Sequence, residues 1–378
     1  MIFLNLILKE IKQQFKSVTF YIFIIIVSIF YVTQYNDTVN RLNPPKPDYV
    51  YNVIEAKSED EKLIIGYKTL DGILLDKYVY KYYPISKKVK LSDSKLDEIK
   101  AFLNKMSSND DVLNIKISDI NIDYDTMIDY MDSLDESLGG NTILGEKYRS
   151  FAREMTYGEA CDDYQKIIDS DEITDSYGRL LADYLGIIAA VFGIFVCVVS
   201  AKRDKTYGVE DIVYSSNVNS IIYMVSKAIG LLVSIMAVFL FIGLIETIIF
   251  FMESVKYNIP VDLLAIFKYI IVWIGPTVMF EVSLCMLIVV LVENAILPII
   301  IQLGLTFLCL LNTEYLGDYA LSKFIIRFNT IDSSNIYNKV SNAITYNRIF
   351  YFCISVVICV LTIWVWHMKR NKILWRRK

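Results

Sequence analysis

The sequence predicts an α-helical polytopic membrane bundle of six transmembrane helices, with an extracytoplasmic α+β domain between helices one and two. Six long apolar runs carry this prediction, together with a polar, acidic stretch that separates the first run from the others. The runs cover residues 18–32, 180–200, 221–251, 270–292, 295–311 and 349–367. About 20 helical residues cross a bilayer core of about 30 Å, and backbone groups cannot stay unpaired in hydrocarbon. Each run therefore predicts a helix, and the sequence lacks the alternating ten-residue segments of a membrane barrel.

Residues 1–16 are predicted to form an amphipathic helix that lies in the membrane interface. One face carries Leu4, Ile7, Leu8, Ile11 and Phe15, and the other carries Asn5, Lys9, Lys12, Gln13 and Lys16. A basic face of this kind attracts anionic lipid head groups, so membrane lipid is an expected partner. A cytosolic extension of helix one is the alternative.

Residues 17–35 are predicted to form transmembrane helix 1. The run 18–32 has the length of a signal peptide core, but the residues that follow it show no small-residue cleavage pattern. We therefore expect an uncleaved anchor.

Residues 36–179 are predicted to form the extracytoplasmic domain. They hold 29 Asp and Glu against 19 Lys and Arg, a net charge of −10, in a chain whose total is −4. About 140 residues are enough for one small domain with its own core. Alternation predicts a hairpin from 78–83 and 87–91 around Pro84 and a further extended segment at 112–117. Apolar spacing predicts helices from Ser92 or Ser94 to Met106, over 124–138 and over 156–168.

Basic residues flank the apolar runs and predict the orientation, because Lys and Arg in short flanking segments are retained in the cytoplasm. The clusters are Lys9, Lys12 and Lys16; Lys202, Arg203 and Lys205; and the tail at 369–378. Both termini are therefore expected inside a plasma membrane. Five basic residues do not fit this orientation, because it places them in outer loops: Lys268, Lys323, Arg327, Lys339 and Arg348.

No catalytic, cofactor-binding or metal-binding site is predicted in this chain. Gly140 and Gly145 have the spacing of a phosphate-binding loop, but Glu146 stands where its lysine belongs. His367 is the one histidine, which excludes a Ser/His/Asp or Cys/His site, and no CxxC or HExxH spacing occurs. We expect a protein that is not an enzyme and that has no nucleic-acid partner.

Residues 180–368 are predicted to hold transmembrane helices 2–6, with a charged cytoplasmic loop at 202–219. Its central residues are Thr206, Tyr207, Gly208, Val209, Glu210, Asp211, Ile212 and Val213. A short helix here would place Val209, Ile212 and Val213 on one side and the acids on another. An ordinary retained loop is the alternative.

In this layout the chain resembles the membrane (permease) subunit of a type-2 ABC exporter. The resemblance rests on the interfacial helix, the anchor, the outer domain, the charged loop with Gly208 and Lys227 at the foot of helix three. A proline common in that family near the end of the loop is absent, since Asn217 or Val218 stands there. The resemblance implies that Thr206 to Val213 couple to a separate cytosolic ATP-binding-cassette subunit, which holds ATP and Mg. It also implies a second, identical or similar permease subunit and short re-entrant helices within 316–346.

Two acids and a set of small residues lie within the apolar runs. Glu281 is near the bilayer centre, where a charge is costly and usually faces a cavity or a partner; a neutral or hydrogen-bonded helix contact is the other interpretation. Glu246 is nearer the outer end and is expected to snorkel to water. Small residues four apart in helix two favour close helix approach: Gly186 with Ala190, and Ala189 with Gly193.

The function predicted from these patterns is ATP-driven export of an amphipathic peptide, drug or lipid. Two alternatives remain. A membrane receptor or anchor would use the outer domain to bind a ligand, and an ion-coupled secondary transporter would use Glu281 to carry the ion. The absence of an internal repeat disfavours the last of these.

Overall fold

The computed structural model describes residues 2–35, 43–51, 53–83, 86–108, 112, 115–171, 173–311, 319–328, 330–331 and 334–376. The chain separates into two compact units, which we treat one at a time. The bundle unit combines Met1–Pro44 with Asp162–Lys378, and the inserted unit is Pro45–Cys161. The inserted unit is shorter than the predicted domain of 36–179, because the residues from Asp162 onward pack with the bundle.

The bundle unit is built almost entirely of helices. These are α1 (Ile2–Gln14), α2 (Val18–Phe30) with the π-helix η1 (Tyr31–Tyr35), α8 (Ile173–Thr206), α9 (Glu210–Ser215), α10 (Ser220–Tyr257), α11 (Ala265–Tyr269), the π-helix η5 (Ile270–Ile274), α12 (Gly275–Val292), α13 (Ile296–Leu311) and α14 (Ser334–Arg376). Helix α7 (Tyr157–Lys166) and the π-helix η4 (Ile167–Asp171) lead into α8.

Among the described residues, five helices are long and apolar enough to cross a membrane. They are Val18–Tyr35, Ile173–Thr206, Ser220–Tyr257, Ala265–Val292 and Ser334–Asn371. The sixth apolar run forms α13, which has only 16 residues. The helical, multi-pass character of the prediction is therefore confirmed, whereas the sixth crossing stays a prediction.

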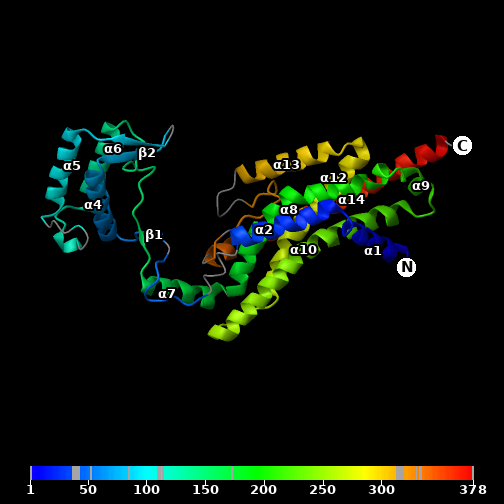
Figure 1. Cartoon of the computed structure of the whole chain (residues 1–378), viewed down its shortest axis with the longest axis horizontal. Coiled ribbons are helices and arrows are strands. Elements are labelled where there is room, and N and C mark those ends of the chain that lie inside the picture. Colours follow the sequence, from blue (N-terminus) through cyan, green and yellow to red (C-terminus); the bar gives the residue numbers. More distant parts are fainter. Residues whose placement is uncertain are drawn as a thin grey trace. The chain divides into compact units, whose positions relative to one another are not determined.

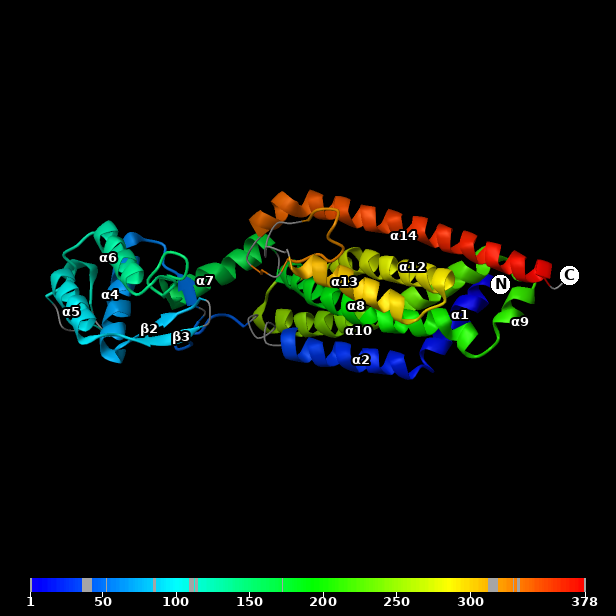
Figure 2. The ribbon, with the colours of Figure 1, turned by 90° about the horizontal axis from the view of Figure 1, so that it is seen from above.

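The long helices of the bundle unit lie side by side, with α2 and α14 on opposite flanks and α8 between them (Figure 2). Helix α13 starts near the α9 end of α12 and runs back toward the other end (Figures 1 and 2). Both chain ends and α9 lie at the same end of this unit (Figures 1 and 2).

The bundle core consists of apolar side chains from α2, α8, α10, α12 and α14. Phe23 of α2, for example, meets Phe239 of α10 edge to face with ring centroids 5.9 Å apart. Lipid tails are as apolar as these side chains, so helix association in a membrane depends on close packing and polar contacts. The contacts made by the small residues and buried acids are therefore important for this fold.

Pro276 lies in the first turn of α12, directly after the π-helix η5. Proline removes one backbone donor and widens the preceding turn, and π-type turns are a common accommodation. The helix is thus irregular next to Pro276, where it forms a π-helical segment.

The segment before α14 differs from the predicted re-entrant helices in 316–346. Residues 319–328 are irregular, α14 already begins at Ser334, and residues 312–318 lie outside the described part. Asp183 of α8, which is fully buried, accepts hydrogen bonds from Arg327 Nε at 2.9 Å and from the Phe328 backbone at 2.7 Å. Arg348 of α14 donates to the Phe324 carbonyl at 3.0 Å. These bonds satisfy backbone that has no helical partners.

The inserted unit contains helices and two small sheets. The helices are α4 (Glu59–Asp76), α5 (Asp93–Met106), the 3₁₀ turn η3 (Ile117–Asp119) and α6 (Tyr124–Ser137). Strands β1 (Val53–Glu55) and β4 (Ala152–Glu154) pair antiparallel, as do β2 (Tyr78–Lys81) and β3 (Lys87–Lys90), where Val79 faces Val89. The predicted hairpin and the predicted helices at 92–106, 124–138 and 156–168 are confirmed, although Pro84 lies outside the described residues. Of the predicted extended segment 112–117, residues 113–114 lie outside the described part, and residues 115–116 form no strand but lead into η3 at Ile117.

Helix α4 has no counterpart in the prediction, yet it lies at the centre of this unit. Ser58 caps its first turn by accepting from the Glu61 backbone at 3.2 Å. At Gly66, an added Cβ would lie 2.2 Å from Met127 Sδ of α6. A glycine therefore permits the close approach of these two helices.

Candidate functional site at the α9 end of the bundle

The candidate site is built where α8 ends and the chain turns through α9 into α10. Thr206 is the last residue of α8, and its hydroxyl donates to the Lys202 carbonyl at 3.1 Å. Gly208 has a φ of 66°, a conformation that glycine adopts without a steric cost. The side chain of Asn219 then caps α10 by accepting from the Ile221 backbone at 2.8 Å.

The predicted loop residues divide into an exposed group and a packed group. Ile212 and Tyr207 are 69% and 74% exposed, and Val209, Glu210 and Asp211 also reach the surface of α9 and its approach. Val213 instead packs against the bundle core, next to the buried Tyr214. Val213 is therefore less exposed than Val209 and Ile212, and it anchors the helix against the bundle.

Side chains of α14 hold α9 in place. Arg370 donates to the carbonyls of Tyr214 at 2.9 Å and Val218 at 2.7 Å, and also to the carbonyl of Ser216. The Trp366 ring lies between two tyrosines, with centroids 5.3 Å from Tyr214 and 5.2 Å from Tyr223. A six-residue helix is not stable by itself, so these contacts fix its position.

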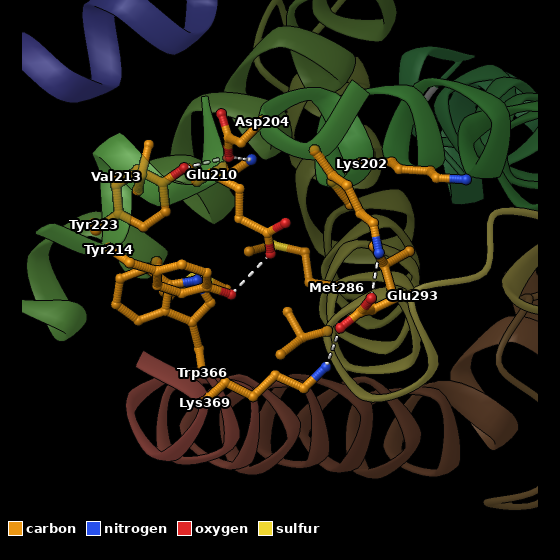
Figure 3. Close-up of a pocket in the computed structure, with 16 residues that line it drawn as sticks. Lys202, Asp204, Glu210, Val213, Tyr214, Tyr223, Met286, Glu293, Trp366 and Lys369 are labelled. Atoms are coloured by element: carbon orange, nitrogen blue, oxygen red, sulfur yellow. Dashed lines mark hydrogen bonds and ion pairs between the residues drawn. The ribbon is translucent and has the colours of Figure 1, made fainter. Parts of the chain in front are cut away.

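Residues from α8, α9, α10, α12 and α14 surround a small pocket behind α9 (Figure 3). Tyr214, Tyr223 and Trp366 lie on one side and Glu293 lies on the other, and Lys369 reaches from beside Trp366 to Glu293. The cavity has a volume of about 60 Å³, which is room for a few water molecules and not for an amphipathic substrate. The pocket is thus lined by α9 and by the ends of α8, α10, α12 and α14.

Ion pairs join the helix ends around the pocket. Asp204 of α8 accepts from Lys227 Nζ of α10 at 2.6 Å and from the Tyr223 hydroxyl. Glu293, just after α12, accepts from Lys205 and from Lys369 Nζ at 2.9 Å. The hydrogen bonds from Lys205 and then Lys369 hold the pKa of Glu293 at about 2, below its ordinary value of 4.5. The carboxylate therefore stays ionised at neutral pH.

Helix α1 is bound to the same end of the bundle through Glu10. This side chain is only 5% exposed and accepts from the Ser200 hydroxyl at 2.7 Å and from the Arg203 guanidinium. An added Cβ at Gly230 would lie 2.6 Å from Glu10 Cβ, so α10 and α1 are in close contact. Leu4, Leu8 and Phe15 point outward, with 49–60% of each exposed. The apolar side of the predicted amphipathic helix is thus free to contact lipid.

The two buried acids lie away from α9 and have polar partners. Glu281 is fully buried on α12 and accepts from Gln302 Nε2 of α13 at 2.9 Å. Glu246 of α10 is also fully buried, and the Tyr31 hydroxyl of η1 donates to its Oε1. The predicted snorkelling of Glu246 to water is therefore wrong, because η1 covers this side chain.

The small residues of α8 contact neighbouring helices of the same chain. An added Cβ at Gly193 would lie 2.7 Å from Glu281 Oε2, and one at Gly186 would lie 3.8 Å from Ile325. Ala189 is fully buried in the bundle core, and the Ala190 carbonyl accepts from the Thr306 hydroxyl at 3.2 Å. The face that was predicted to favour close approach packs against α12, α13 and the segment before α14.

Three residues that matter here were not singled out by the sequence: Glu10, Glu293 and Arg370. Glu10 carried a usable signal, because it interrupts the lysines of an otherwise basic helix face. Arg370 was counted only as one charge of the basic tail. Within the described residues, no group of three or more His, Cys, Asp or Glu side chains is arranged to hold a metal ion.

Comparisons with protein-family models, with curated proteins and with solved structures find no match to this chain.

Proposed function

We propose that this chain is the permease subunit of an ATP-driven exporter, powered by a separate cytosolic ATP-binding-cassette subunit that docks on α9. The observation that carries the proposal is the combination of exposure and anchoring in α9. Ile212 is 69% exposed, while Arg370 and Trp366 hold the backbone of the same helix against α14 and α10. An apolar side chain displayed on a fixed support suits a docking contact.

The connections behind α9 suit the transmission of movement. Asp204 joins α8 to α10, and Glu293 joins the end of α12 to α8 and α14. A partner that displaced α9 would therefore act on four long helices together, because packed helices move as units. The pocket behind α9 is too small for a substrate, which favours a partner contact over a transport site.

The proposal includes six crossings, an outer domain and cytoplasmic termini. Helix α13 runs between the two ends of the bundle unit, although it is short, and both chain ends lie beside α9. Two of the five basic residues that do not fit this orientation form ion pairs: Arg327 with Asp183, and Lys268 with Asp175.

The substrate is proposed to be an amphipathic molecule that leaves the cytoplasm or the membrane. The permease would act as a pair with an identical or similar subunit, and ATP and Mg would bind only to the partner ATPase. The inserted unit would lie outside the cell membrane.

The test is a double variant, Val209→Glu with Ile212→Glu, in membranes that also contain the ATP-binding-cassette ATPase proposed as the partner. If both side chains are buried in the contact, removing this apolar area at about 25 cal/mol per Å² weakens binding by a few kcal/mol. Co-purification of the ATPase and ATP-driven transport should both be lost. Leu264→Glu is the matched control, because Leu264 is equally apolar and 72% exposed but lies away from α9. Normal binding and transport by the double variant would overturn the proposal.

A further inference from the structure

The contact between Glu281 and Gln302 leaves two oxygen atoms without a partner. Gln302 Nε2 donates to Glu281 Oε1 at 2.9 Å. Among the described residues, nothing donates to Glu281 Oε2 or to Gln302 Oε1, and the two residues are 0% and 1% exposed. Buried polar atoms of this kind are rare in folded proteins and need an explanation.

An ionised Glu281 would be costly at this position. No Lys, Arg or His among the described residues forms an ion pair with it, and α13 carries no charged residue. The titratable groups close to it are the thiols of Cys197 and Cys285. The guanidinium of Arg348 of α14 instead donates to Thr277, which lies one turn from Glu281 along α12, to Asn347 and to backbone carbonyls. A charge buried without a counter-ion is strongly destabilising, and more so deep in a bilayer.

We propose that Glu281 and Gln302 form a proton-binding site that locks α12 to α13. One proton on Glu281 Oε2 supplies the missing donor, and the resulting hydroxyl donates to Gln302 Oε1. The carboxylic acid and the amide then exchange two hydrogen bonds, one in each direction, so a single proton satisfies both unpartnered oxygens. The proton comes from hydronium in the solvent: its O–H bond breaks, one O–H bond forms on Glu281 Oε2, and a water molecule is released.

Gly193 of α8 leaves room for the carboxyl group of Glu281. An added Cβ there would come within 2.7 Å of Glu281 Oε2, the atom that carries the proton. Alanine at position 193 would therefore push the carboxyl group away from Gln302. The site thus depends on three helices, and its proton can leave only when α12 and α13 separate enough to admit water. This inference does not depend on the proposed ATPase partner.

Infrared spectroscopy of the purified full-length chain tests the site, because a protonated carboxyl group has a carbonyl stretching band separate from that of a carboxylate. Glu281→Gln should remove one protonated-carboxyl band while the melting temperature stays close to that of the wild type, since glutamine can make both hydrogen bonds. Glu246→Gln is the control, and it should leave that band in place. Gln302→Leu should keep the band but shift it to higher frequency, because the hydroxyl loses its acceptor.

Gly193→Ala should shift the same band, whereas Gly186→Ala, which has room at 3.8 Å, should not. The proposal is overturned if Glu281→Gln removes no protonated-carboxyl band, or if Gln302→Leu leaves that band unshifted. It is also overturned if sodium or potassium raises the melting temperature of the wild type and not of Glu281→Gln. That result would assign the site to a metal cation.

Discussion

The acids of this bundle have different partners in different places: those near α9 are paired with bases, whereas Glu246 and Glu281, inside the bundle, are not. Glu10, Asp204 and Glu293 each accept from Arg or Lys. Among the described residues, Glu246 and Glu281 have only a tyrosine and a glutamine as partners. Ionised pairs suit the rim, where water reduces the cost of charge, whereas the interior favours neutral hydrogen-bonding groups. The comparison indicates that ion pairs hold the α9 end together, whereas Glu246 and Glu281 are held by hydrogen bonds from neutral groups.

The largest expected effect comes from removing a buried member of an ion pair. Glu10→Ala should destabilise the bundle by about 3 kcal/mol, because it leaves the largely buried guanidinium of Arg203 without its counter-charge. Denaturant titration in detergent would measure this loss, and α1 should become sensitive to protease. A loss under about 1 kcal/mol would show that α1 is not held by this pair.

An intermediate effect is expected for Glu281. Glu281→Leu should cost about 1–3 kcal/mol, because it leaves the amide of Gln302 buried without an acceptor. Glu281→Gln should keep both stability and most ATP-driven export. Complete loss of transport in the glutamine variant, with assembly and ATP hydrolysis intact, would favour the ion-coupled alternative and contradict a purely structural proton.

The smallest effect is expected for Glu293, whose side chain is 45% exposed. Its folded pKa of about 2 is below its ordinary value of 4.5. The group therefore stabilises the fold above pH 4.5, and this contribution is lost as the pH falls from 4.5 toward 2. Exposed pairs contribute at most about 1 kcal/mol, so Glu293→Gln should lower the melting temperature slightly at neutral pH and flatten its acid dependence. An unchanged acid dependence would show that the two lysines do not stabilise the ionised form.

Sequence patterns predicted the parts of this fold that depend on local composition. The apolar runs became helices, and Ser92 begins α5 at the expected cap position. Helix α4 escaped prediction because its apolar residues are spread around the helix and it contains Gly66 and Gly72, which are poor helix formers. Its position is decided by packing against α6, which no local pattern reports.

The sequence predicted which segment forms the candidate site, but not the tertiary contacts that hold it. The charged loop at 202–219 with Gly208 located α9, but the residues that fix this helix in place come from far along the chain. Arg370 is more than 150 residues from the carbonyls to which it donates, and Arg203 is 193 residues from Glu10. The burial of Glu246 depends in the same way on Tyr31, which belongs to a different helix. Such contacts follow from the tertiary fold and cannot be inferred from the local patterns of one sequence.

The central claim, that α9 faces the cytosol and docks an ATPase, is tested most directly by labelling Ile212→Cys in a cysteine-free background. An impermeant maleimide should label position 212 in inside-out vesicles and not in right-side-out vesicles, because this side chain is 69% exposed in the isolated chain. Adding the ATP-binding-cassette ATPase should protect it, while Leu264→Cys should be labelled only from the other side. Labelling of position 212 from outside, or undiminished labelling with the ATPase bound, would contradict the claim.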